Sequence, residues 1–227
     1  KTGIWQTADS AQAAVYGAKP GYIRFADLDK SNTIEPNNDR TILGSGQATW
    51  QGGMTNRFTY KGFDLSFVLY ARMGGLLVSQ VYQPYAAYLS ILNARRNNVK
   101  VDYWTPTNPT NKFPSPAGML ASGAIGLSTL GYYDASFIKM RSINFGYSFN
   151  AKLLNSLKAQ SIRVYATAQN PFVLYSPYMR EGGVDPEATA LGNTGVQSPG
   201  NLSSRALTIG VAPPPTRAFL FGVSVQF

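Results

Sequence analysis

The last eleven residues, RAFLFGVSVQF at positions 217–227, alternate between two kinds of side chain. The large apolar residues fall on the odd positions, which are Phe219, Phe221, Val223, Val225 and Phe227. This period of two predicts a β-strand, and its length matches the about 9–11 residues with which a tilted strand crosses a bilayer. A strand of a soluble β-sandwich could show the same pattern, but here no polar tail follows Phe227. We therefore predict the last strand of an outer-membrane barrel, with odd positions facing lipid and the smaller or more polar even positions facing the lumen.

Four segments upstream show a similar alternation: residues 48–60, 63–73, 134–149 and 161–170. Only Lys61 and Gly62 separate the first two segments, which predicts an antiparallel hairpin with a tight turn. In the third segment, Lys139 and Arg141 fall on the otherwise apolar face. We expect them above the hydrocarbon, because Lys or Arg at the bilayer midplane costs about 2–4 kcal/mol. The predicted fold class is all-β, an antiparallel transmembrane β-barrel segment of about five strands with long extracellular loops.

The connections between these strands differ sharply in length. The short ones are residues 61–62 and the moderate link 150–160, and the long ones are residues 8–47, 74–133 and 171–216. Outer-membrane barrels combine short periplasmic turns with long extracellular loops, so this pattern favours a barrel. Within the connections and before them we expect the tail of a strand at 1–7, a loop with a Pro-Gly turn at 8–26 and a short helix near 85–96.

Composition excludes several classes of protein. The 227 residues include no His and no Cys, which rules out a Ser-His-Asp triad, a His-ligated metal and a disulfide framework within this chain. The formal charge is +9, yet the basic residues are scattered rather than clustered, so no nucleic-acid partner is expected. No apolar run reaches the about 18–20 residues of a membrane-spanning helix. Aromatic residues make up 13% of the chain, which suits the aromatic girdles of a barrel.

Several phrases of the sequence, in order, resemble the SusC/RagA family of TonB-linked (TonB-dependent) outer-membrane transporters of Bacteroidota. They are IWQT (4–7), PGYIRFADLD (20–29), NDRTILG (38–44), a Trp followed by GGMTNRFTYKGFDLSF (50–67), YWTPTNP (103–109), YYDASFIKMRSINFGYSF (132–149), IRVYATAQNPF (162–172), GVDPE (183–187) and the closing Phe227. Each phrase alone is weak, but together they are specific and cover nearly the whole chain.

The resemblance implies a barrel of about 22 strands that is plugged by an N-terminal domain. It also implies a SusD-like lipoprotein lid, energy from the TonB complex, and oligosaccharides or peptides as cargo. The predicted strands are fewer than the about eight of a closed membrane barrel, and the plug and the TonB box are absent from this chain. The sequence also begins abruptly at Lys1 without a signal peptide. We therefore expect residues 1–227 to be the C-terminal part of such a receptor in the cell outer membrane, contacting lipid and the remainder of the barrel and plug.

The polar stretch 27–39 resembles the start of a calcium loop, which places oxygen ligands at alternate positions. The predicted ligands are Asp27, Asp29, Ser31, Thr33, Glu35 and Asp39. Asn32 stands at the sixth position, which tolerates a left-handed backbone, and Ile34 at the apolar eighth. The family pattern here is D-x-N-x-D-G-x-I ending in Asp-Arg; Ser31 replaces an acid, Asn32 replaces Gly, and Asp39 falls one residue past the twelfth position. An Asx-rich turn without metal is the alternative. Apart from Ca²⁺, no cofactor is expected.

Other polar and aromatic residues are assigned structural roles. Asp185 and Glu187 in the GVDPE turn, and Asp134 at the start of a strand, are expected to fold loops rather than to catalyse a reaction. The outer-loop aromatics are expected to pack on each other, with contact to a sugar or to a lid protein as the alternative. They are Tyr82, Tyr85, Tyr88, Tyr103, Trp104, Tyr132, Tyr133, Tyr175 and Tyr178. The predicted lumen face, which contacts the plug or the solute, comprises Arg57, Asp64, Tyr70, Arg72, Arg163, Tyr165 and Gln169.

These observations lead to three hypotheses about function. The first is that the chain forms barrel wall and extracellular loops of a SusC-like transporter and does no covalent chemistry. The second is an outer-membrane adhesin or structural surface protein that oligomerises to close its sheet. An outer-membrane hydrolase is the least expected, because no His is available. The sequence does not identify the cargo or assign ligand-binding residues.

Overall fold

The computed structural model describes residues 1–35, 37–79, 101–121, 128–150, 154, 159–187, 207–209 and 215–227. The chain divides into two compact units. The first comprises Lys1–Ser45, Leu77–Tyr133 and Ala190–Val211, and the second comprises Gly46–Leu76, Asp134–Thr189 and Ala212–Phe227. The helix predicted near 85–96 lies outside the described residues.

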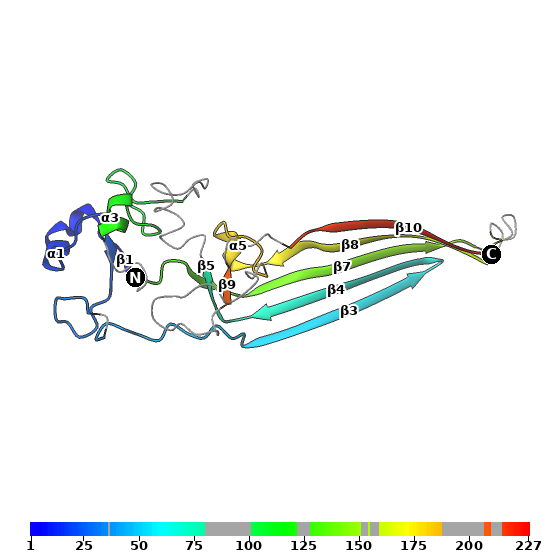
Figure 1. Cartoon of the computed structure of the whole chain (residues 1–227), viewed down its shortest axis with the longest axis horizontal. Helices are drawn as coiled ribbons and strands as arrows, with labels where there is room; N and C mark the ends of the chain where they lie inside the picture. Colours follow the sequence, from blue (N-terminus) through cyan, green and yellow to red (C-terminus); the bar gives the residue numbers. More distant parts are fainter. Residues whose placement is uncertain are drawn as a thin grey trace. The chain divides into compact units, whose positions relative to one another are not determined.

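A five-stranded antiparallel sheet dominates the second unit, in the order β10-β8-β7-β4-β3 (Figure 1). The strands are β3 (Trp50–Tyr60), β4 (Phe63–Met73), β7 (Phe137–Ser148), β8 (Ser161–Tyr175) and β10 (Ala218–Gln226). All five predicted strands are confirmed, although β8 continues to Tyr175 rather than ending at 170. Strands β3 and β10 stand at the two edges, so these strands form an open sheet and not a closed barrel.

The turn between β3 and β4 is the predicted two-residue hairpin. Lys61 and Gly62 have φ angles of 44° and 87°. Two positive φ angles are what a type I′ turn requires, and this turn matches the right-handed twist of the flanking strands. A Cβ on Gly62 would lie 2.7 Å from the carbonyl oxygen of Ser148, so the turn requires glycine for space as well as for conformation.

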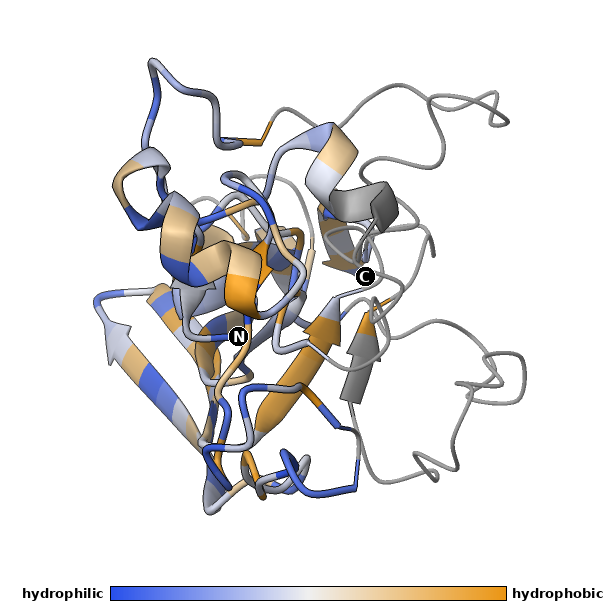
Figure 2. Cartoon of the chain, turned by 90° about the vertical axis from the view of Figure 1, so that its left-hand side faces the viewer, coloured by the Kyte–Doolittle hydropathy of each residue, from blue (hydrophilic) through white to orange (hydrophobic). Residues whose placement is uncertain are grey.

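The register gives the sheet two chemically different faces, because directly paired residues of neighbouring strands point to the same side. One row across the five strands is apolar: Phe58, Leu65, Phe145, Ala166 and Phe221. The adjacent row on the opposite face is Thr59, Asp64, Gly146, Tyr165 and Gly222. In Figure 2, bands of hydrophilic and hydrophobic colour follow one another along the strand at the lower left. We call these the apolar face and the polar face, and the predicted alternation is confirmed.

β-bulges in the pairing of β7 with both of its neighbours break this alternation. The register shifts between Met140 and Ser142 against β8, and between Val68 and Leu69 against β4. Against β4, Arg141 is thus an extra residue, whereas against β8 it stands opposite both Asn170 and Pro171. One extra residue reverses the faces of all positions beyond it. Lys139 pairs with Tyr70 and joins the polar face. The prediction that Lys139 and Arg141 lie on the apolar face is therefore wrong.

The first unit begins with a two-stranded ladder, β1 (Gly3–Ile4) with β2 (Ile23–Arg24). Between them lie the 3-10 helix η1 (Thr7–Asp9) and the helix α1 (Ser10–Val15), where the sequence predicted only a loop. That prediction is wrong for 8–15, because the alanine-rich SAQAAV segment favours helix and buries Ala13 completely. The predicted Pro-Gly turn is present, with Gly21 at φ 86°.

Shorter elements complete the described part of the chain. They are β5 (Leu76–Ser79), α3 (Pro116–Ala121), β6 (Tyr132–Asp134), α5 (Pro177–Arg180) and β9 (Leu207–Ile209). β6, β5 and β9 form a three-stranded sheet in that order, with β5 and β9 parallel. The predicted strand 134–149 is interrupted at Ala135–Ser136, which separates β6 from β7. Within the described residues, no helix has the length and apolar character needed to cross a bilayer.

Candidate functional site

The polar face carries an ion pair that crosses a strand, close to the end of the sheet at which β3 and β4 are joined. Arg163 on β8 donates to both carboxylate oxygens of Asp64 on β4, with Nε–Oδ1 at 3.1 Å and Nη2–Oδ2 at 2.7 Å. The two side chains pass over Gly146 of β7, where a Cβ would collide with both of them. Asp64 is 15% exposed and Arg163 39% exposed, so the pair is reachable from the polar face.

The remaining predicted lumen residues share this face. Their register pairings place Arg57, Tyr70, Arg72, Tyr165 and Gln169 on the same side of the sheet as Asp64 and Arg163. Tyr165 lies over Gly222 of β10, in the space that a side chain there would fill. Thr167 also donates to Asn144 Oδ1 at 2.8 Å. The sequence therefore identified the members of the polar face correctly, and whether they contact a plug or a solute stays a prediction.

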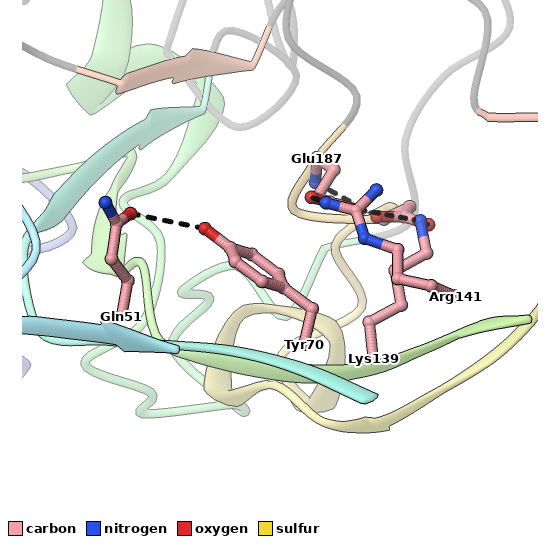
Figure 3. A network of polar contacts seen from close by, with 6 residues as sticks. Gln51, Tyr70, Lys139, Arg141 and Glu187 are labelled. Atoms are coloured by element: carbon pink, nitrogen blue, oxygen red, sulfur yellow. Dashed lines mark hydrogen bonds and ion pairs between the residues drawn. The ribbon is translucent and has the colours of Figure 1, made fainter. Parts of the chain in front are cut away.

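A buried charge cluster, drawn in Figure 3, lies near the opposite end of the sheet, where β7 begins. Lys139, which is 1% exposed, places Nζ 2.7 Å from Asp185 Oδ2 and 3.1 Å from Glu187 Oε2. Arg141 Nη2 lies 2.6 Å from Glu187 Oε1. We call these four residues the clamp. Two cations balance two carboxylates here, so Lys139 is buried with compensation.

Tyr70 of β4 lies beside the clamp on the polar face. Its hydroxyl donates to Gln51 Oε1 at 3.2 Å, and the guanidinium carbon of Arg141 lies 4.8 Å from its ring centroid. The ring centroid of Phe137 lies 5.8 Å away. Sequence reasoning missed this cluster as a unit. The available signal in the sequence was that Lys139 and Arg141 fell on the apolar face of β7 when the strand was taken as regular.

The three carboxylates outside the 27–39 loop that the sequence assigned to loop folding do fold loops. Asp185 and Glu187 belong to the clamp, and Asp185 Oδ1 also accepts from the backbone N–H of Glu187 at 3.0 Å. Asp134 Oδ1 accepts from both the backbone N–H and the hydroxyl of Ser136, at 2.9 and 2.6 Å. This structural role is confirmed.

The 27–39 loop brings three carboxylates together. Oxygens of Asp27, Asp29 and Asp39 all lie within 4.8 Å of one another. Asp39 thus joins the cluster although it stands one residue past the expected position. Glu35 directs its carboxylate to the side-chain amide of Asn38 at 2.9 Å and is outside this cluster. The predicted left-handed sixth residue is confirmed, since Asn32 has φ 62°.

Hydrogen bonds hold the Asp27 carboxylate in the charged form. It accepts from the backbone N–H groups of Ser31 and Asn32 and from the Tyr16 hydroxyl, at 3.1, 2.9 and 3.1 Å. Loss of surrounding water works to raise the pKa of Asp27, but these hydrogen bonds outweigh it and lower that pKa overall. Asp39 similarly accepts from the backbone N–H groups of Leu28 and Glu35. These contacts suit an Asx-rich turn and a cation-binding loop equally well.

The outer-loop aromatics divide by exposure. Trp104 is 6% exposed and Tyr178 fully buried, so both pack within the protein as predicted. Trp104 also donates from Nε1 to Gln6 Oε1 at 2.9 Å. Tyr103 is exposed, and Tyr175 is half-buried under the guanidinium of Arg180. Tyr132 and Tyr133 are half-buried; Tyr82, Tyr85 and Tyr88 lie outside the described residues.

Comparison with known proteins gives a consistent result. No family model matches the sequence. The chain is 28% identical over 210 residues to TonB-dependent receptor P3 of Formosa agariphila. The aligned region covers 92% of this chain and 19% of the receptor. It is 30% identical over 212 residues to TonB-dependent receptor SusC of Bacteroides thetaiotaomicron, covering 92% of this chain and 18% of SusC. This chain is a homologue of SusC-like TonB-dependent receptors.

Two solved structures share the fold of this chain. A structure of the RagAB peptide importer in the closed-closed state matches 91% of this chain and 21% of the compared chain, with a TM-score of 0.61 at 18% identity. A second RagAB peptide transporter structure matches with a TM-score of 0.62 at 18% identity, over 87% and 19% of the two chains. The chain spans about a fifth of the length of the relatives that it matches.

Proposed function

We propose that this chain forms barrel wall and extracellular loops of a SusC-like TonB-dependent transporter in the outer membrane. The observation that carries the proposal is the two-faced sheet. Strands β3 and β4 are 11 residues each, or about 37 Å along the strand, which a tilt of about 40° reduces to about 28 Å. This length covers the hydrocarbon of a bilayer, and the apolar face presents large exposed residues such as Phe58 and Phe221.

The open edges of the sheet support a larger assembly. β3 and β10 each leave one side unpaired within the sheet, and unpaired strand edges are costly in lipid. In our proposal the remainder of the barrel pairs with both edges, and residues 1–227 are the C-terminal part. A plug domain and the TonB box then belong to the rest of the receptor. The chain would do no covalent chemistry, and a SusD-like lipoprotein would close the barrel over oligosaccharide or peptide cargo.

Uptake by the complete receptor tests this proposal. Cells that lack the receptor gene are complemented with it, and accumulation of labelled oligosaccharides and peptides is measured with and without functional TonB. We expect TonB-dependent accumulation of one of these solute classes. Outer-membrane insertion without uptake, together with self-assembly of the receptor through its strand edges, would instead support the adhesin hypothesis.

We also propose that the 27–39 loop binds Ca²⁺ through Asp27, Asp29 and Asp39, with Ser31, Thr33 and Glu35 as the further predicted ligands. Three carboxylates held so close repel one another, and a divalent cation relieves this repulsion while accepting oxygen ligands. The lowered pKa of Asp27 keeps it ionised at neutral pH. Two left-handed residues, Lys30 and Asn32, already give the loop the tight curvature that such a site uses.

Substituting Asp39 with asparagine is expected to weaken calcium binding. The loss should be at least about tenfold, the scale seen when supporting groups of a metal site are removed. Isothermal titration of the purified complete receptor with Ca²⁺ measures it, and proteolysis of residues 27–39 with and without a chelator gives a second readout. Asp9→Asn is the control, because Asp9 is in the same unit and outside the cluster. Equal heats for both variants would identify the loop as an Asx-rich turn only.

A further inference from the structure

We propose that residues 176–187 fold into the barrel lumen and narrow it. We call these residues the in-folded segment. They follow β8 and contain α5 and the two acidic members of the clamp. The inference rests on the proposed function, because the polar face becomes a lumen only in a barrel. The in-folded segment turns back along the barrel wall and does not project from its rim.

The ion pairs show which face the in-folded segment covers. Lys139 is on the polar face because it pairs with Tyr70 across the bulge. Arg141 also approaches the ring of Tyr70. In Figure 3, Tyr70, Lys139 and Arg141 extend from the same side of their strands, and Glu187 lies above them. The acidic end of the segment therefore lies over the polar face.

The depth of the contact follows from strand geometry. β7 begins at Phe137, and Arg141 is the fourth residue after it. At about 3.3 Å per residue, Arg141 stands about 13 Å along the strand from its loop end. Glu187 Oε1 lies 2.6 Å from the Nη2 atom of this side chain, and Asp185 Oδ2 lies 2.7 Å from Lys139 Nζ. Because β8 ends at Tyr175, opposite Ile138, the segment that follows must turn back over the polar face to meet both side chains.

Burial shows that the contact is packed. Phe137 pairs with Arg72 and is thus an apolar residue on the polar face, yet it is only 2% exposed. Tyr178 in α5 is fully buried, and the Ser176 hydroxyl accepts from the backbone N–H of Met179 at 3.3 Å to cap that helix. An apolar side chain on a water-filled face requires a cover. The ring centroid of Tyr70 lies 5.8 Å from that of Phe137, and we assign the rest of this cover to residues 176–187.

The outer side of the in-folded segment would meet passing solute. Met179 and Val184 are 37% and 39% exposed, and Arg180 and Glu181 are exposed as well. This mixed surface has no net charge and no dominant chemistry. The in-folded segment therefore selects passing solutes by their size and not by the sign of their charge.

Cysteine labelling of the complete receptor in intact cells tests the position of the segment. This chain has no Cys, so Glu181→Cys gives one reporter on the in-folded segment and Ile42→Cys, at a residue 94% exposed, gives the matched reporter on a long outer loop. Each is reacted with a small maleimide and with a maleimide carrying a long polyethylene glycol chain. We expect similar rates with the small reagent and a slowing of Glu181→Cys by about an order of magnitude with the large one.

Breaking the clamp should remove this difference. Lys139→Met added to Glu181→Cys is expected to raise its reaction rate with the large reagent to that of Ile42→Cys, whereas Arg163→Met, which breaks an ion pair elsewhere on the polar face, should leave it slow. Equal rates for Glu181→Cys and Ile42→Cys with the large reagent, without any clamp substitution, would overturn the in-folded segment but leave the transporter intact. If neither reporter is labelled until the cells are lysed, both the in-folded segment and the proposed transporter function are overturned.

Discussion

Replacing Phe221 with arginine is expected to lower the free energy of unfolding of the membrane-inserted receptor by about 2–4 kcal/mol. Phe221 lies in the middle of β10 on the apolar face and is 82% exposed in the chain alone. If this face meets lipid, the arginine must leave water for hydrocarbon. Urea titration of the receptor folded into lipid vesicles, followed by its heat-dependent mobility on gels, measures the loss.

Leu220→Arg is the matched control for this substitution. Leu220 is the neighbouring residue, is itself 47% exposed and pairs with Thr167 on the polar face. Because that side is a water-filled lumen in our proposal, the same arginine should cost little there. Equal and small costs at both positions would contradict the membrane assignment of the sheet, since a soluble sheet has no lipid side.

Replacing Lys139 with methionine is expected to lower the free energy of opening residues 176–187 by about 3 kcal/mol. Removing one partner of a buried ion pair leaves the other charges without compensation, and the measured scale of that loss is about 3–5 kcal/mol. Arg141 still serves Glu187 in the variant, so we expect the lower end. Hydrogen exchange of the backbone amides of residues 176–187 in the complete receptor measures the opening directly.

Arg163→Met provides the comparison for Lys139→Met. Arg163 is 39% exposed, so its pair with Asp64 is screened by water and should contribute less than about 1 kcal/mol. The exchange of residues 176–187 should not respond to it. Unchanged exchange in Lys139→Met would show that apolar packing, such as that of the buried Tyr178, holds the segment without the clamp.

The sequence predicted the sheet well, because period-two alternation is a local property. The hairpin at Lys61-Gly62 and the paired faces of β8 and β10 needed no information beyond neighbouring residues. The bulge at Arg141 was not predictable in this way, since a bulge is a property of two paired strands. Reading β7 as regular therefore placed Lys139 on the wrong side.

The loops were harder for a related reason. Asp39 joins Asp27 and Asp29 only when the loop closes, so counting positions put it one residue out of place. Helix α1 is six residues long and too short to be stable alone. It is held by the burial of Ala13 and by Trp5, whose ring centroid lies 5.8 Å from that of Tyr16 just past the helix. Such tertiary support leaves little trace in a local pattern.

The bridge between Arg163 and Asp64 also has a mechanical meaning. It joins β4 to β8 across the bare backbone of Gly146, so three strands share one diagonal brace. The smallest slip that keeps both faces correct is two residues, about 7 Å along the strand, and it would pull the two charges apart. A load directed along the strands, such as one from a segment drawn through the lumen, would therefore have to separate this ion pair in addition to the backbone hydrogen bonds of the three strands.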